Sequence, residues 1–127
     1  MTEAVLDTSA VLAFLRGESG GELVGPILGD CAISSVNLAE VITKLIDRGS
    51  TAEQARQTTE TLSMNVVAAT LETAALAGML HARTRGRGVS LGDRFCLALA
   101  METGLPVYTA DRAWAELGLD LDIRLIR

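Results

Sequence analysis

The chain has 127 residues and a formal net charge of −5, and 49% of its residues are hydrophobic although only 3% are aromatic. This length predicts one domain, spanning residues 1–127, with a core large enough to need no disulfide. No apolar stretch reaches the roughly 18 residues of a membrane span, and no signal-like segment opens the chain. These features argue against a membrane protein and favour a cytoplasmic location.

Short apolar runs mark the expected strands. They lie at Ala4–Leu6, Cys31–Ile33, Asn65–Ala68, Val107–Thr109 and Ile123–Ile126. Most of them are continuously apolar, which is typical of a parallel sheet covered by helices on both faces. The last run alternates apolar and polar residues, so we expect it to be an edge strand. Cys31 and Cys96 lie in apolar stretches without metal-ligand spacing and are predicted to be reduced core residues.

Stripes of apolar residues at helical spacing lie between these runs. They predict helices over 38–46, 51–63, 71–80 and 91–103. The last segment is apolar nearly all round and should be buried. Ser50 and Glu53 form a capping-box pattern that should open the helix over 51–63. Alternating strands and helices predict an α/β fold of three layers, with a central parallel sheet of about five strands flanked by helices.

Four acids follow strands or open helices. Asp7 ends the first predicted strand, Glu40 lies in the first turn after the second, Asp93 opens the buried helix, and Asp111 follows the fourth strand. In a parallel sheet these places meet beyond the carboxyl ends of the strands, where ligands bind. Carboxylate oxygens suit Mg²⁺ or Mn²⁺, ions that activate water and stabilise the transition state of phosphoryl transfer. The pattern therefore favours a metal site.

Each acid also has a simpler interpretation as a helix cap, because Asp and Glu are preferred at helix N-termini. Two observations favour a shared cation for the set. Asp7 and Asp111 both follow apolar strands, and Asp93 opens a helix too apolar to be exposed. Two charges ~5 Å apart repel by roughly 3 kcal/mol at an effective dielectric of about 20, and a cation offsets that cost. Spacing alone leaves both interpretations open.

The segments around the four acids resemble the motifs of PIN-domain ribonucleases, and in particular those of VapC-type toxins of type II toxin–antitoxin systems. The similar segments are residues 5–12, 35–41, 91–100 and 107–114, and they cover nearly the whole chain in order. The resemblance implies a Mg²⁺- or Mn²⁺-dependent endoribonuclease that cleaves RNA phosphodiester bonds with metal-activated water. It implies that the metal-binding and catalytic residues are Asp7, Glu40, Asp93 and Asp111.

The same resemblance implies supporting residues and partners. Thr109 occupies the position of a hydroxyl that steadies the acids, and Ser9 and Asn37 are further supporting candidates. The expected partners are an RNA substrate, a small cognate antitoxin that binds near residues 36–63, and a second copy of the chain in a homodimer. The resemblance does not identify the RNA that is cut.

Arginines gather before the third motif. Within residues 83–94, Arg83, Arg85, Arg87 and Arg94 stand against Asp93 alone. Together with Arg112 they are candidates for binding RNA phosphates, so the negative net charge does not exclude an RNA partner. Ordinary solubilising charge explains them equally well.

Two rival functions use the same features. A phosphoacceptor receiver-like signalling domain is also a small acidic α/β unit that binds Mg²⁺, but it would need a lysine after a later strand. The only lysine, Lys44, lies within a predicted helix. A catalytically silent PIN scaffold that acts as a binding module is disfavoured because all four acids are present.

Overall fold

The structure is a computed structural model that describes residues 2–127. Its strands are β1 (Ala4–Leu6), β2 (Cys31–Ser34), β3 (Asn65–Val67), β4 (Val107–Thr109) and β5 (Ile123–Leu125). They form one parallel sheet in the order β3-β2-β1-β4-β5. The five predicted strands are confirmed to within one residue at each end, and so is the edge position of the last one.

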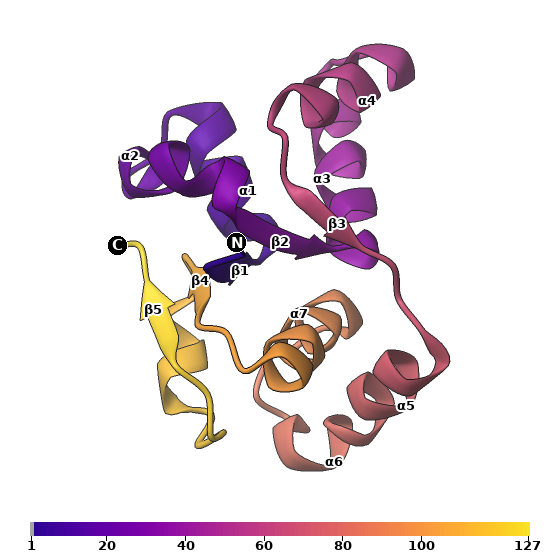
Figure 1. The fold of residues 1–127 in the computed structure, drawn as a ribbon, viewed down its shortest axis with the longest axis vertical. Coiled ribbons are helices and arrows are strands. Elements are labelled where there is room, and N and C mark those ends of the chain that lie inside the picture. Colours follow the sequence, from indigo (N-terminus) through magenta and orange to yellow (C-terminus); the bar gives the residue numbers. More distant parts are fainter. Residues whose placement is uncertain (1) are drawn as a thin grey trace.

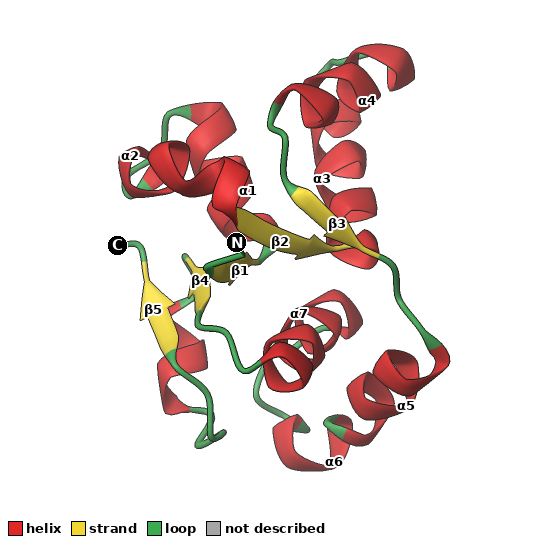
Figure 2. Cartoon of the chain, viewed as in Figure 1, coloured by secondary structure: helices red, strands yellow, loops and turns green. Residues whose placement is uncertain are grey.

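Helices cover both faces of this sheet. They are α1 (Thr8–Arg16), α2 (Gly21–Val24), α3 (Ser35–Asp47), α4 (Ala52–Thr61), α5 (Leu71–Met79), α6 (His81–Thr84) and α7 (Leu91–Thr103), with 3-10 helices η1 (Gly25–Asp30) and η2 (Arg112–Glu116). Figure 1 shows α1 and α2 on one side of the sheet and α5, α6 and α7 on the other, and Figure 2 shows the same three layers by element type. The predicted three-layer α/β fold is confirmed.

Two apolar clusters fill the space between the layers. Leu6 packs with the residues of α1 and η1 on one face of the sheet, and the neighbouring Val5 packs with those of α5 and α7 on the other. The strands are continuously apolar because successive side chains point into different clusters. Cys31 and Cys96 are free and buried, one in each cluster, as predicted.

Helix α7 has the bounds that the sequence predicts. Ser90 accepts the N–H of Asp93 and the Asp93 carboxylate accepts the N–H of Ser90, so a capping box opens the helix. Gly104 closes it in the left-handed conformation at φ 70°. Its buried residues are Gly92 and the run from Cys96 to Ala100, which packs on the sheet and confirms the prediction of a buried helix.

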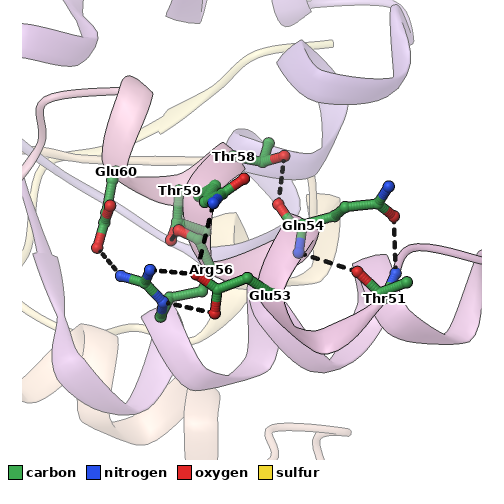
Figure 3. A network of polar contacts seen from close by, with 8 residues as sticks. Thr51, Glu53, Gln54, Arg56, Thr58, Thr59 and Glu60 are labelled. Carbon is green, nitrogen blue, oxygen red and sulfur yellow. Dashed lines mark hydrogen bonds and ion pairs between the residues drawn. The ribbon is translucent and has the colours of Figure 1, made fainter.

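Helix α4 begins one residue later than predicted. Figure 3 shows that Thr51 accepts the N–H of Gln54 and that the Gln54 side chain accepts the N–H of Thr51. The predicted capping box of Ser50 and Glu53 is therefore wrong, because Glu53 pairs instead with Arg56 one helical turn further on.

The predicted helix over 71–80 is confirmed as α5, which ends one residue earlier, and a turn at Leu80 separates it from α6. Across residues 2–127, we find no helix with the length and apolar character needed to cross a membrane.

Candidate active site

The candidate site lies where the strand order reverses. β1 pairs with β2 on one side and with β4 on the other, so the chain builds the sheet outward in both directions from this point. In open parallel sheets, ligands bind at such a point, beyond the carboxyl ends of the strands. Asp7 directly follows β1 and Asp111 comes two residues after β4, so both acids lie there. Glu40 and Asp93 come from α3 and α7, which are in contact with each other.

Asp7 is a buried carboxylate, with only 3% of its surface exposed. As the N-cap of α1 it accepts the N–H of Ala10 at 2.8 Å, and it also accepts the hydroxyls of Ser9 at 2.8 Å and Thr109 at 2.6 Å. Burial, with a smaller contribution from the charge of Asp93, raises the pKa of Asp7 to about 6, although the three hydrogen bonds act in the opposite direction. The carboxylate is thus held firmly in a place that disfavours its charge.

Thr109 and Ser9 join the ends of β1 and β4. While it donates to Asp7, the Thr109 hydroxyl accepts the N–H of Asp111 at 3.0 Å. The Ser9 hydroxyl similarly accepts the N–H of Ala110 at 2.9 Å. Asp111 itself caps η2 by accepting the N–H of Ala113 at 3.0 Å. These bonds fix the backbone before Asp111 relative to the Asp7 carboxylate.

Glu40 lies in the second turn of α3, so its predicted place in the first turn is wrong. Ser34 is the N-cap of α3 and accepts the N–H of Val36 at 3.2 Å, which puts the helix start one turn before Glu40. Glu40 Oε1 accepts the hydroxyl of Thr8 at 2.7 Å and the amide of Asn37 at 2.8 Å. Thr8 is a residue that the sequence analysis missed, and its position directly after Asp7 was the only available signal.

Asn37 is buried and links α3 to α7. Its amide nitrogen also donates to the backbone oxygen of Gly92 at 3.0 Å, next to Asp93. Its amide oxygen is buried and has no hydrogen-bond partner among residues 2–127. A buried oxygen of this kind calls for a water molecule or an ion nearby.

Asp93 is linked electrostatically to each of the other three acids. Burial raises the pKa of its half-buried carboxyl, and the charges of Glu40 and Asp111 raise it further, although the bonds to Ser90 lower it. The charge of Asp93 in turn raises the pKa of Asp7. Repulsion among the acids therefore acts chiefly through Asp93.

The expectation that the carboxylates lie close enough to share one ion is not met. Within residues 2–127, no three Asp, Glu, His or Cys side chains are near enough to one another to hold a metal ion together. The physical reason is that each carboxylate is drawn to its own hydrogen-bond donors, and three of them, Asp7, Asp93 and Asp111, also cap helices. Binding one ion would require some of these side chains to move closer together.

The donor set nevertheless fits Mg²⁺ or Mn²⁺ in chemical type. All four candidates are carboxylates, the ligands that hard divalent cations prefer, and none of them takes part in an ion pair formed within residues 2–127. Asp7, Glu40, Asp93 and Asp111 are thus the residues that would hold the metal.

The candidate RNA-binding arginines are not all free to reach a ligand. Arg94 donates to the backbone oxygen of Ala77 at 3.1 Å and ties α7 to α5. The Arg87 side chain donates to the backbone oxygen of Glu116 at 2.6 Å, and that of Arg112 donates to the backbone oxygen of Arg127 at 3.2 Å. Arg83 and Arg85 are exposed, and their side chains make no hydrogen bond within residues 2–127. This pair is therefore the better placed for contact with RNA.

Comparison with known proteins agrees with the fold and the motifs. The family model described as the PIN domain matches residues 4–119. The fold is similar to DNA-bound VapBC from Salmonella typhimurium (21% identity, TM-score 0.75, 100% of each chain covered). It is also similar to a VapBC toxin–antitoxin structure from Mycobacterium tuberculosis (25% identity, TM-score 0.67, 100% of this chain and 99% of that one).

A third structure, a VapC toxin from Mycobacterium tuberculosis that cleaves the sarcin–ricin loop, has 19% identity and a TM-score of 0.73, with 92% of this chain and 96% of that one covered. Curated protein sequences give no significant match. The family model covers most of the chain and includes all four acids. The chain therefore belongs to the PIN domain family.

Proposed function

We propose that this protein is a Mg²⁺- or Mn²⁺-dependent endoribonuclease and the toxin of a VapBC-type toxin–antitoxin pair acting in the cytoplasm. The observation that carries the proposal is the placement of the four acids: Asp7 and Asp111 lie at the reversal point of the sheet, and Glu40 and Asp93 lie on the contacting helices α3 and α7. None of the four is paired to a basic side chain within residues 2–127. When bound, the metal supplies an activated water and offsets the charge of the phosphodiester.

The chain's own residues have separable roles in this proposal. The four acids hold the metal, Ser9 and Thr109 fix the Asp7 carboxylate, and Asn37 fixes that of Glu40. The exposed Arg83 and Arg85 hold RNA phosphates. RNA is supported as the substrate class by the similar toxin that cleaves the sarcin–ricin loop.

An RNA cleavage assay on the purified protein tests the activity. We expect cleavage with Mn²⁺ or Mg²⁺ and none in EDTA. Asp111→Asn should abolish cleavage without unfolding the protein, because Asn caps a helix as well as Asp does but lacks the charge. Asp120→Asn, at an exposed position, is the matched control and should cleave like wild type. Cleavage that persists in EDTA, or an active Asp111→Asn protein, would contradict the proposal.

The proposed antitoxin would bind along α3, α4 and β3. A cavity of about 230 Å³ opens there, lined by Leu38, Thr59, Glu60, Ser63, Met64 and Val66. Toxin–antitoxin complexes are among the similar structures, which supports such a partner. We expect the product of the neighbouring open reading frame to co-purify with the chain and relieve its toxicity. Val66→Lys should weaken this binding, whereas Leu23→Lys, at another exposed apolar residue, should not.

The proposal includes a homodimer formed through exposed apolar side chains, among which Leu71 and Met79 are the most exposed. Light scattering of the purified protein measures its oligomeric state and tests for the dimer. PIN family membership replaces the receiver-like interpretation. A catalytically silent scaffold remains the rival, and it predicts neither metal-dependent cleavage nor thermal stabilisation by Mn²⁺.

A further inference from the structure

The carboxylate of Glu40 is held by contacts from three helices. Thr8 of α1 and Asn37 of α3 both donate to Oε1, at 2.7 and 2.8 Å. Because both bonds end on the same oxygen, neither of them occupies Oε2. A long, flexible side chain is thereby fixed in one rotamer with one oxygen left for another ligand.

Gly92 of α7 provides the space for that carboxylate. A Cβ atom built on Gly92 would overlap both oxygens and the carboxyl carbon of Glu40. The glycine is not required by its backbone, since Gly92 lies in the first turn of α7 and does not have positive φ. Alanine would be the better helix former at this position. The role of Gly92 must therefore be to make room for the carboxylate beside Asp93.

We propose that Thr8 and Gly92 are positioning residues for Glu40. Thr8 fixes Oε1, and the missing side chain at Gly92, the residue before Asp93, leaves room for the Glu40 carboxylate. Holding the carboxylate in place before a metal binds removes the cost of ordering it at that moment. This inference rests on the proposed metal-dependent function, but the placement of the carboxylate can be measured without any metal.

Gly92→Ala is the decisive variant. The atoms that the new methyl group meets are the far end of a flexible side chain, so Glu40 should move and the fold should survive. We expect an equal or higher melting temperature in EDTA, a Mn²⁺ Kd weakened by roughly 10-fold or more in calorimetry, and a changed ¹³C shift of the Glu40 carboxyl. Gly78→Ala is the matched control, because it is also helical and has open space around its Cβ position. It should leave the Mn²⁺ Kd and the Glu40 shift unchanged.

Thr8 is tested by a pair of substitutions. Thr8→Val keeps the shape but removes the donor, so it should weaken Mn²⁺ binding, and Thr8→Ser should restore it. Thr43→Val, which removes an exposed hydroxyl that donates only to the backbone of its own helix, controls for the chemical change. A merely structural role for Thr8 would lower the melting temperature without changing the Mn²⁺ Kd.

The outcomes separate this inference from the proposed function. If wild type binds Mn²⁺ and Asp93→Asn does not, yet Gly92→Ala and Thr8→Val bind like wild type, the positioning roles are wrong and the metal site stands. If wild type itself binds no Mn²⁺, the proposed function fails, and the Glu40 carboxyl shift still decides the placement. An unchanged shift in both variants overturns the inference. Should Gly92→Ala fail to fold, the Thr8 pair decides.

Discussion

Two regions of this molecule are rich in acidic residues, and they shift carboxyl pKa values in opposite directions. On α4, Glu53 and Glu60 stand in solvent on either side of Arg56 and form ion pairs with it, as Figure 3 shows. The hydrogen bond from Arg56 lowers the pKa of Glu53. At the reversal point of the sheet, burial instead raises the pKa values of Asp7 and Asp93, and the charges of neighbouring acids raise them further.

The difference shows which acids lack a compensating positive charge. The negative charges of the glutamates on α4 are already stabilised, because both water and Arg56 interact favourably with them. The site acids have hydrogen bonds but no compensating cation within residues 2–127. Such a cluster can relieve its repulsion by taking up protons or by binding a cation. The predictions below test this contrast, from the largest expected effect to the smallest.

Asp93→Asn should have the largest effect, and it should move stability and activity in opposite directions. It removes one charge from the centre of the cluster and keeps the size of the side chain. We expect RNA cleavage to fall by roughly 100-fold or more. The melting temperature in EDTA should stay equal or rise, and the thermal gain from Mn²⁺ should shrink. Thermal melts with and without Mn²⁺, run beside a cleavage assay, measure all three.

If Asp93 were only a helix cap, the same substitution would give the reverse pattern. Stability would fall slightly, since Ser90 and Asp93 cap each other, and neither the metal response nor cleavage would change. An active Asp93→Asn protein with an undiminished metal response would remove the basis of the proposed function.

Asp7 should make the stability of the EDTA-treated protein depend on pH. Its pKa is about 6 in the folded chain against 3.8 ordinarily, so the folded state holds the proton more tightly than the unfolded state does. The resulting stabilisation is fully present below pH 3.8 and is lost as pH rises through about 6. It amounts to about 3 kcal/mol, the value of a shift of about two pKa units.

Denaturation of wild type and Asp7→Asn at several pH values between 4 and 7 isolates this effect, because Asn does not titrate and the other groups cancel in the difference. The advantage of wild type over the variant should shrink as pH rises. Mn²⁺ should bind better above pH 6, once the carboxyl has lost its proton. A difference in stability that is constant with pH would show that Asp7 is not a buried acid of raised pKa.

Thr109→Val should destabilise the protein by about 1–3 kcal/mol, since it removes one of the hydrogen bonds to the buried Asp7 carboxylate and leaves the N–H of Asp111 without its partner. The pKa of Asp7 should also rise, because the bond from Thr109 is the largest influence that lowers it. NMR titration of Asp7 checks this, and Thr109→Ser, which keeps the hydroxyl, should keep the pKa near that of wild type. A merely packing role for Thr109 would leave the pKa unchanged.

Glu53→Gln should have the smallest effect. It breaks an exposed ion pair that water and salt already weaken, so the melting temperature should hardly change. Cleavage and the response to Mn²⁺ should stay as in wild type. This variant therefore serves as the matched control for Asp93→Asn, and a large loss of activity would mean that the two acid-rich regions are not independent.

The sequence by itself determined the strands, the buried helix and the identity of the four acids. Continuous apolar runs are a local signal. β1 and β4 have the predicted bounds because such a run is recognised without knowing which distant segments pack against it. Helix α7 begins and ends as predicted for the same reason, with Ser90 and Gly104 marking its limits. The short helices α2, η1 and η2 escaped prediction because four to six residues carry too little periodicity to be recognised.

The tertiary structure alone decided how the acids are held. The bond between Thr109 and Asp7 joins residues 102 positions apart, and the bond from Thr8 to Glu40 spans 32 positions. The raised pKa of Asp7 comes first from burial, which only the packed layers produce. Local sequence patterns show which side chains are present and which of them lie on the same face of a helix or strand. The distances and the dielectric surroundings that set their chemistry arise only when distant segments pack together.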